Sequence, residues 1–216
     1  MLQDGNVGPA RSTIYSLLSR CFADHLVVDS GDVVATLSQA ADPAVLAFLS
    51  SQPTASPVLA KLEELTEVLV GLGRDEAAEL AAQREFVLLF LLPTGVQPYE
   101  SVYRDPERML KGTSWSEVRA FYRRCGLAVA EDEHHPEDHI ASELAFMSLL
   151  SSGFAPETVD LRHEQRAFLQ EHLLTWVPEL VSRISQHPKA DFYRRVGDLL
   201  SSWVECERGW LSDPDA

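Results

Sequence analysis

Cysteine is scarce in this sequence. The 216 residues include three cysteines, Cys21, Cys125 and Cys206, which are far apart and form no C-x-x-C motif. Such an odd, scattered set excludes a disulfide framework and a cysteine-based zinc site, and it fits a reducing cytosol. The amino-terminal stretch "MLQDGNVGPARS" lacks the basic and apolar regions of a secretory signal. We therefore expect a cytoplasmic protein.

Positive charge is also scarce. Lysine and arginine number 18 against 33 acidic residues, a net charge of −15 with a pI near 4.8. A phosphate backbone would be repelled, so nucleic-acid binding is disfavoured. A basic partner would be attracted, although charge alone is better explained by acids that keep the protein in solution.

Long apolar runs and common catalytic motifs are absent. The longest run, "FVLLFLLP" from Phe86, is far short of the roughly 20 residues that span a membrane, so we expect a core helix there. The sequence contains no Walker A motif, G-x-G-x-x-G, G-x-S-x-G or H-E-x-x-H. We therefore predict neither an enzyme nor a bound cofactor.

Helical periodicity runs through most of the chain instead. Apolar residues recur every three or four positions, and Asp, Ser, Pro and Gly stand where helices begin or end. This pattern predicts an all-α fold, a single bundle of about ten helices without strands. The later expected helices cover 105–112, 114–126, a segment from Pro136, 158–176, 178–187 and 189–208, with Pro178 and Pro188 as boundaries.

One stretch, "PTGVQPYESVYR" at 93–104, has two prolines and no period. A loop of this length is uncommon unless it has a function. The chain is expected to form one domain, 1–216, in which this loop joins an N-terminal lobe 1–92 to a C-terminal lobe 105–216. Within the loop, Tyr99, Ser101 and Tyr103 either pin it by packing and hydrogen bonds or contact a ligand.

A second stretch, "HPEDHIASELAFM", begins at His135. Pro136 suits a first helical position, so we expect the helix to start there. At about 100° per residue, His139 and Glu143 then fall inside the apolar arc of that helix. In one interpretation the two side chains satisfy each other in the core. Asp138 either caps the helix or faces a cleft.

The same stretch offers a metal site as an alternative. His135, His139 and Glu143 are spaced by four and four residues, and two histidines with a carboxylate suit a transition metal. Against this, Pro136 places His135 at or before the helix start, where its side chain need not share a face with His139. We therefore predict no metal.

Several segments together resemble a known family. In order, they are "REFVLLFLLP", "QPYESVYRD", "VRAFYRRCGL", "PEDHIASELAFMSLL", "FLQEHLLTWVPELVSRI" and "DFYRRVGDLL". They resemble the TorD/DmsD/NarJ-type redox-enzyme maturation chaperones, over residues 84 to about 204. One departure is that His135 stands where the family usually has an acidic residue before the proline.

The resemblance implies an all-helical cytoplasmic chaperone. Such a protein binds an apo-molybdoenzyme of the DMSO/TMAO reductase type and its twin-arginine leader, assists insertion of the molybdopterin cofactor, and delays export until folding is complete. The resemblance leaves open weak GTP binding and whether the protein is a monomer or a domain-swapped dimer.

The resemblance also implies a peptide-binding region. A leader that joins two guanidinium groups to an apolar stretch needs carboxylates beside an apolar, aromatic groove. Glu143 would give structural support. The residues expected to bind the peptide are Leu89, Phe90, Pro98, Tyr99, Glu100, Ser101, Tyr103, Asp138 and His139.

Two hypotheses from other classes compete with the chaperone. A metal-dependent helical hydrolase would use His135, His139 and Glu143 and would retain metal on purification. A nonspecific acidic adaptor would bind basic peptides of any sequence and would release them in moderate salt.

Overall fold

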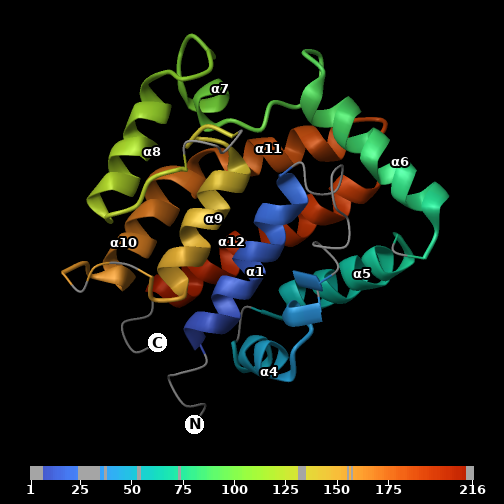
Figure 1. The fold of residues 1–216 in the computed structure, drawn as a ribbon, viewed down its shortest axis with the longest axis horizontal. Coiled ribbons are helices and arrows are strands. Elements are labelled where there is room, and N and C mark those ends of the chain that lie inside the picture. The colour runs from blue at the N-terminus through green and yellow to red at the C-terminus, as the bar shows by residue number, and fades with distance from the viewer. Residues whose placement is uncertain are drawn as a thin grey trace.

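The computed structural model describes residues 7–23, 35–36, 38–52, 55–72, 74–130, 135–154, 156 and 158–212. Ten α-helices and two π-helical turns have their bounds within these ranges, and these ranges contain no strand (Figure 1). The prediction of an all-α bundle of about ten helices is confirmed. None of the described helices is both long enough and apolar enough to cross a bilayer.

The α-helices are numbered in chain order. Their bounds are α1 Val7–Phe22, α4 Pro43–Ser51, α5 Ser56–Leu72, α6 Glu76–Phe86, α7 Glu100–Arg104, α8 Thr113–Arg124, α9 Ile140–Ser151, α10 Leu161–Phe168, α11 Leu174–Gln186 and α12 Phe192–Ser212. The π-helical turns are η2 Val87–Leu91, which extends α6, and η3 Leu169–Leu173, which joins α10 to α11.

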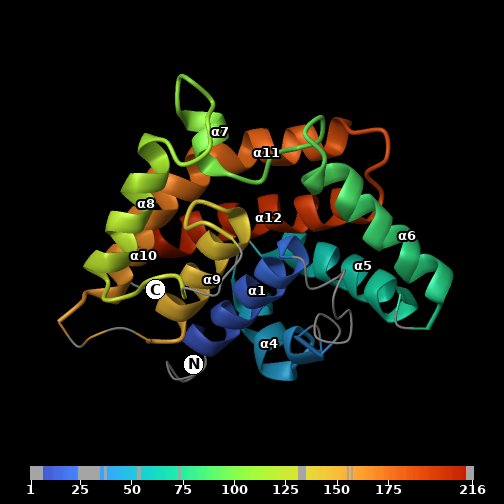
Figure 2. The ribbon, with the colours of Figure 1, turned by 45° about the horizontal axis from the view of Figure 1, so that its top comes forward.

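Helices α1 and α9 lie side by side in the middle of the molecule, and α12 contacts α1 and lies behind them in the view of Figure 1 (Figures 1 and 2). Helix α12 also contacts α5, α6, α10 and α11, so it is the centre of the bundle. The stripe of α1 that includes Ile14, Leu17 and Leu18 is fully buried, as its period of three and four predicts.

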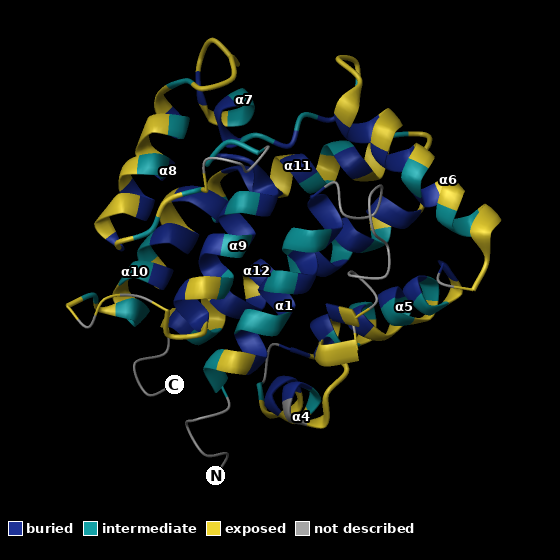
Figure 3. Cartoon of the chain, viewed as in Figure 1, coloured by how far each residue is buried: buried dark blue, intermediate teal, exposed yellow. Residues whose placement is uncertain are grey.

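One hydrophobic core includes side chains from α1 through α12 (Figure 3). Its largest fully buried members are Trp176, Trp203, Tyr15 and Tyr193. The three cysteines are also buried, and burial raises the pKa of Cys21 to about 12. The division into lobes 1–92 and 105–216 stays a prediction.

Glu85 of α6 fixes the start of the central helix. Its carboxylate accepts hydrogen bonds from the backbone N–H groups of Asp191, Phe192 and Tyr193 at 2.9, 3.1 and 2.7 Å. The free N–H groups at a helix start are normally capped by a neighbouring side chain in the sequence. Here the cap comes from a distant helix, which ties α6 and the following turn η2 to α12.

Three predicted boundaries were wrong. The helix expected from Pro136 begins four residues later, at Ile140. Pro178 lies inside α11 and ends no helix, whereas Pro188 does lie between α11 and α12. The stretch 105–112 is not helical; it is a series of turns in which Arg108 and Lys111 adopt φ angles of 51° and 58°. The helical turn lies just before it, as α7, within the expected loop 93–104.

Candidate functional site

The two unusual stretches of the sequence meet in space. The N–H of Glu100 donates to the carbonyl of Asp138, and the N–H of Ile140 donates to the carbonyl of Pro98, both at 2.9 Å. Tyr99 and His139 thereby form an isolated antiparallel bridge, with their rings edge to face at 5.1 Å. We call residues 98–103 and 135–140 the clip.

Asp138 caps α7, not α9, the helix that follows it in the sequence. Its Oδ2 accepts hydrogen bonds from the N–H and the hydroxyl of Ser101, at 3.2 and 2.6 Å, at the start of α7. The side chain is fully buried, and its Oδ1 has no hydrogen-bond partner in the structure. Burial raises the pKa of Asp138, against the bonds from Ser101. Asp138 therefore neither caps α9 nor faces an open cleft.

His139 is the N-cap residue of α9. Its Nδ1 accepts a hydrogen bond from the N–H of Ala141 at 3.1 Å. Burial, followed by the neighbouring His135, holds the pKa of His139 well below its ordinary value of 6.5. The rings of the two histidines are stacked at 4.1 Å, with 13° between their planes. His139 is thus a neutral, structural ring.

The expected His139–Glu143 pair is wrong. The Nε1–H of Trp176 donates to Glu143 Oε2 at 3.2 Å, and the other close partner of Glu143 is the carboxyl of Glu100. Burial and then Glu100 raise the pKa of Glu143 well above its ordinary value. The protonated form of Glu143 is therefore favoured beside Glu100.

Sequence reasoning missed His172, which completes this buried cluster. The Nδ1 of His172 lies 3.1 Å from both carboxyl oxygens of Glu100, which is fully buried. Arg104 pairs with the same carboxylate from one helical turn away. A signal was available, because His172 stands four residues from both Phe168 and Trp176 and so lies on an apolar helical face.

The second segment of the clip, 135–140, is anchored to α8. The Nε1–H of Trp115 donates to Glu137 Oε2 at 2.7 Å, and the hydroxyl of Tyr122 donates to the carbonyl of Glu137 at 2.9 Å. Arg119 also pairs with Glu137, at 3.2 Å. The spacing of the clip residues in the sequence predicts neither these contacts nor the contacts of His172 and Trp176.

The remaining predicted residues divide between core and surface. Leu89 and Phe90 of η2 are buried, and Phe90 packs edge to face on Tyr193 at 4.8 Å. Tyr103 is half-buried between Trp176 and the guanidinium of Arg183. The exposed apolar side chains beside the clip in sequence are instead Val87, Leu88, Leu91, Leu92, Met109 and Leu110.

Gly95 permits the tight turn between η2 and the clip. The N–H of Val96 donates to the carbonyl of Leu89 at 2.6 Å, folding the chain back on itself. A Cβ at Gly95 would clash with that same carbonyl oxygen, so this close approach requires glycine.

The structure does not assemble the alternative metal site. His135 and His139 stack on each other, while Glu143 contacts Trp176 and Glu100. Within the described ranges, no three or more His, Cys, Asp and Glu side chains gather as metal ligands. This geometry gives the hydrolase hypothesis no support.

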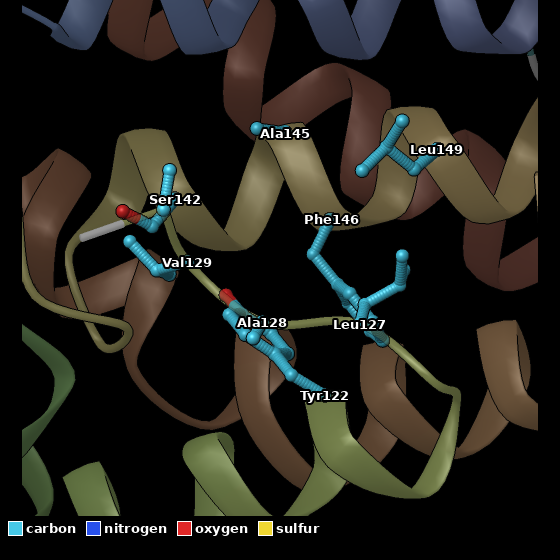
Figure 4. Close-up of a pocket in the computed structure, with 9 residues that line it drawn as sticks. Tyr122, Leu127, Ala128, Val129, Ser142, Ala145, Phe146 and Leu149 are labelled. Carbon is cyan, nitrogen blue, oxygen red and sulfur yellow. The ribbon is translucent and has the colours of Figure 1, made fainter. Parts of the chain in front are cut away.

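Two pockets are lined by residues close to the clip in sequence, although no clip residue lines either of them. A pocket of about 650 Å³ with charged and apolar lining residues lies between α7, α8 and η3, with His172 in its lining. A smaller apolar cavity of about 140 Å³ lies between α9 and the segment 127–130 (Figure 4). Phe146 and Leu149 line this second cavity, which is smaller than most ligand sites.

Comparison with known proteins identifies the family. Residues 51–182 match the family described as "Nitrate reductase delta subunit". The chaperone protein TorD of Shewanella loihica is 30% identical to this chain over 92% of each sequence. This chain belongs to the TorD-type family of redox-enzyme maturation chaperones.

Other relatives agree along nearly the full length. TorD of Shewanella pealeana is 29% identical over 95% of this chain and 91% of its own, and TorD of Vibrio vulnificus is 27% identical over 93% and 94%. This TorD-type protein is a molybdoenzyme maturation chaperone and not an enzyme. The clip joins the two stretches, Pro98–Tyr103 and Asp138–Glu143, on which the sequence resemblance most depends.

Proposed function

We propose that this chaperone works in the cytoplasm on an apo-molybdoenzyme of the DMSO/TMAO reductase type. It binds that enzyme and its twin-arginine leader, assists insertion of the molybdopterin cofactor, and delays export until the enzyme has folded. Family membership supports the client class, and a net charge of −15 favours a basic leader.

The clip is the observation that carries the leader-binding part of this proposal. It holds aromatic and acidic side chains in a fixed frame, with two backbone hydrogen bonds and the cap from Asp138. On either side along the chain lie exposed apolar residues, among them Leu91 (59% exposed) and Met109 (59%). Exposed apolar side chains near a rigid polar frame are a common feature of peptide-binding surfaces.

We assign different roles to the residues of this region. Tyr99, Tyr103 and Glu100 contact the leader or the side chains that face it. Pro98, Ser101, Asp138 and His139 hold the clip in place, Leu89 and Phe90 support it from the core, and Glu143 supports Glu100. Because Asp138 and Glu100 are both fully buried, direct contact of either carboxylate with a leader requires the clip to open.

The protein is expected to bind a twin-arginine leader about tenfold or more tightly than the same peptide with both arginines replaced by lysine. Guanidinium groups pair bidentately with carboxylates, whereas ammonium groups act as point charges. Calorimetric titration of both synthetic peptides measures the ratio. Equal affinities that both vanish in moderate salt would support a nonspecific acidic adaptor instead.

A second arm of this test addresses the client. Affinity purification from the native cell, followed by mass spectrometry, is expected to recover a molybdopterin enzyme. Recovery of unrelated basic proteins, with no molybdopterin enzyme among them, would contradict the proposed client.

Asp138→Asn is expected to leave leader affinity within about twofold of wild type, and Asp138→Ala to weaken it by about tenfold. The asparagine oxygen still accepts both bonds from Ser101, whereas alanine leaves a buried N–H at the start of α7 without a partner. Calorimetric titration measures affinity, and the melting temperature checks folding. If asparagine weakens binding as much as alanine does, the charge of Asp138 itself meets the leader.

A further inference from the structure

Three carboxyl groups are buried together where the clip meets α9. Glu100 and Asp138 belong to the clip, Glu143 belongs to α9, and all three side chains are fully buried. The charges of Glu100 and Asp138 both act on Glu143. A negative charge on Glu143 therefore faces two carboxyl groups of the clip.

Glu143 has little support for a negative charge. The Nε1–H of Trp176 donates to its Oε2 at 3.2 Å, whereas its Oε1 is buried and receives no hydrogen bond within the described part of the chain. A buried carboxylate is costly unless hydrogen-bond donors or a cation compensate it. A bound proton meets this need, because it removes the charge and supplies a donor toward Glu100.

Other elements contribute few compensating charges to Glu143. The titratable groups around the cluster are Glu100 and Arg104 of α7, Asp138 of the clip, Tyr122 of α8 and His172 of η3. Arg104 pairs with Glu100, and His172 lies 3.1 Å from the same carboxylate. Helix α1 meets this end of α9 through the uncharged Ser19. Both basic groups thus lie against Glu100 and not against Glu143.

The clip is easier to displace than α9. In segment 98–103, two of the three buried side chains are polar, those of Glu100 and Ser101. Helix α9 instead buries an apolar stripe that includes Leu144 and Met147, and it packs along α1. Segments with few buried apolar side chains open at low cost in free energy, whereas core helices open only with the whole domain. Movement of the clip is therefore the easier way to relieve repulsion among the three carboxyls.

We propose that the proton on Glu143 keeps the clip closed: while it is bound the two segments of the clip stay paired, and its loss to solvent frees segment 98–103 and exposes Glu100 and Asp138. Water then solvates these carboxylates, which offsets the loss of the two backbone hydrogen bonds of the clip. Burial and Glu100 raise the pKa of Glu143, so the change occurs above its ordinary pKa of 4.5. The clip is thus a proton-controlled gate to its own carboxylates.

Amide hydrogen exchange of the full chain, measured by NMR, tests this gate. The N–H groups of Glu100 and Ile140 donate the two backbone hydrogen bonds of the clip, and the N–H of Tyr193 in the core is the reference for global unfolding. Both clip amides are expected to be protected about tenfold or more weakly than Tyr193. Their protection factors are expected to fall by about tenfold for each pH unit between 4.5 and the raised pKa of Glu143.

Glu143→Gln and Glu117→Gln are matched variants, because each removes one negative charge near Arg104. Glu117 is about half exposed, so Glu117→Gln is expected to follow the wild type. Glu143→Gln keeps an oxygen for the Trp176 N–H, and the protection of its clip amides is expected to stay constant over the same pH range. Wild-type clip amides that are protected as strongly as Tyr193, or protection that falls equally in both variants, would overturn the proposal.

A second measurement follows the proton itself. Infrared difference spectroscopy of the wild type is expected to show the C=O band of a protonated Glu143, which disappears over the pH range in which the clip amides lose protection. This band is expected to remain in Glu117→Gln and to be lost in Glu143→Gln. Loss of the band without loss of clip protection, or the reverse, would show that this proton does not hold the clip. Neither measurement uses a leader peptide, so failure of the gate is distinguishable from failure of the proposed function.

Discussion

Raising the pH from 4.5, the ordinary pKa of Glu143, through its raised pKa is expected to lower the contribution of this group to the free energy of unfolding, and Glu143→Gln is expected to remove most of that loss. Burial and the nearby Glu100 raise the pKa of Glu143 in the folded chain. The folded protein therefore holds this proton more tightly than the unfolded chain does. The resulting stabilisation is fully present below the ordinary pKa of 4.5 and is lost as the pH rises through the raised value.

The expected loss of free energy of unfolding is large for a single titrating group. Each pH unit between the ordinary and the raised pKa of Glu143 lowers the free energy of unfolding by about 1.4 kcal/mol. Above the raised pKa, a further rise in pH adds nothing to this loss. Glutamine keeps an oxygen for the Trp176 N–H and provides a permanent donor toward Glu100. Urea unfolding at several pH values measures the effect.

Glu205→Gln is the control for this experiment, because Glu205 is about half exposed on α12. Its pH profile should follow that of the wild type. A Glu143→Gln profile that also follows the wild type would contradict the raised pKa of Glu143. On the acid side, the lowered pKa of His139 predicts a loss of stability as the pH falls below 6.5, the ordinary pKa of histidine. In that range the unfolded chain binds a proton at this residue, whereas the folded chain does not.

Arg11→Ala is expected to destabilise the whole bundle by about 3–5 kcal/mol. Arg11 of α1 forms two hydrogen bonds with Glu207 of α12, at 2.8 and 2.6 Å, and both side chains are buried. Tyr15 donates to the same carboxylate at 3.0 Å, and Trp210 stacks on the guanidinium at 3.9 Å. Removing the arginine leaves a buried carboxylate without a countercharge.

Urea unfolding of matched variants tests this ion pair. The double variant Arg11→Met with Glu207→Leu is expected to lose less stability than Arg11→Ala, because it removes both charges and keeps apolar volume. Arg208→Ala, which breaks an exposed pair on the same helix, should cost about 0–1 kcal/mol. Equal losses in Arg11→Ala and Arg208→Ala would contradict the role of the buried pair.

Much of the fold could be read from local patterns. The buried stripe of α1 follows from its period of three and four, and Asp75 caps α6 through the N–H of Ala77, as its position before a helical run predicts. Such features depend on residues within one or two helical turns of each other. They need no knowledge of what packs against the helix.

Long-range contacts overrode the local signals at Pro136 and Pro178. Pro136 is a good first helical residue, but Ile140 gives its N–H to Pro98, and residues up to His139 lie in the clip. Pro178 lacks the N–H that a helix interior uses, yet it lies within α11, where packing on α12 outweighs the loss of one hydrogen bond.

For the candidate site, the sequence by itself determined which stretches are unusual: the proline-rich loop with Tyr99 and Glu100, and the run with Asp138, His139 and Glu143. Only the tertiary structure decided their partners. Glu143 meets Glu100 and Trp176, not His139, and Asp138 caps α7 from a distance of 37 residues. The physical reason is that a buried polar group must find a partner wherever the packing of distant helices supplies one, and helical spacing alone carries no record of that packing.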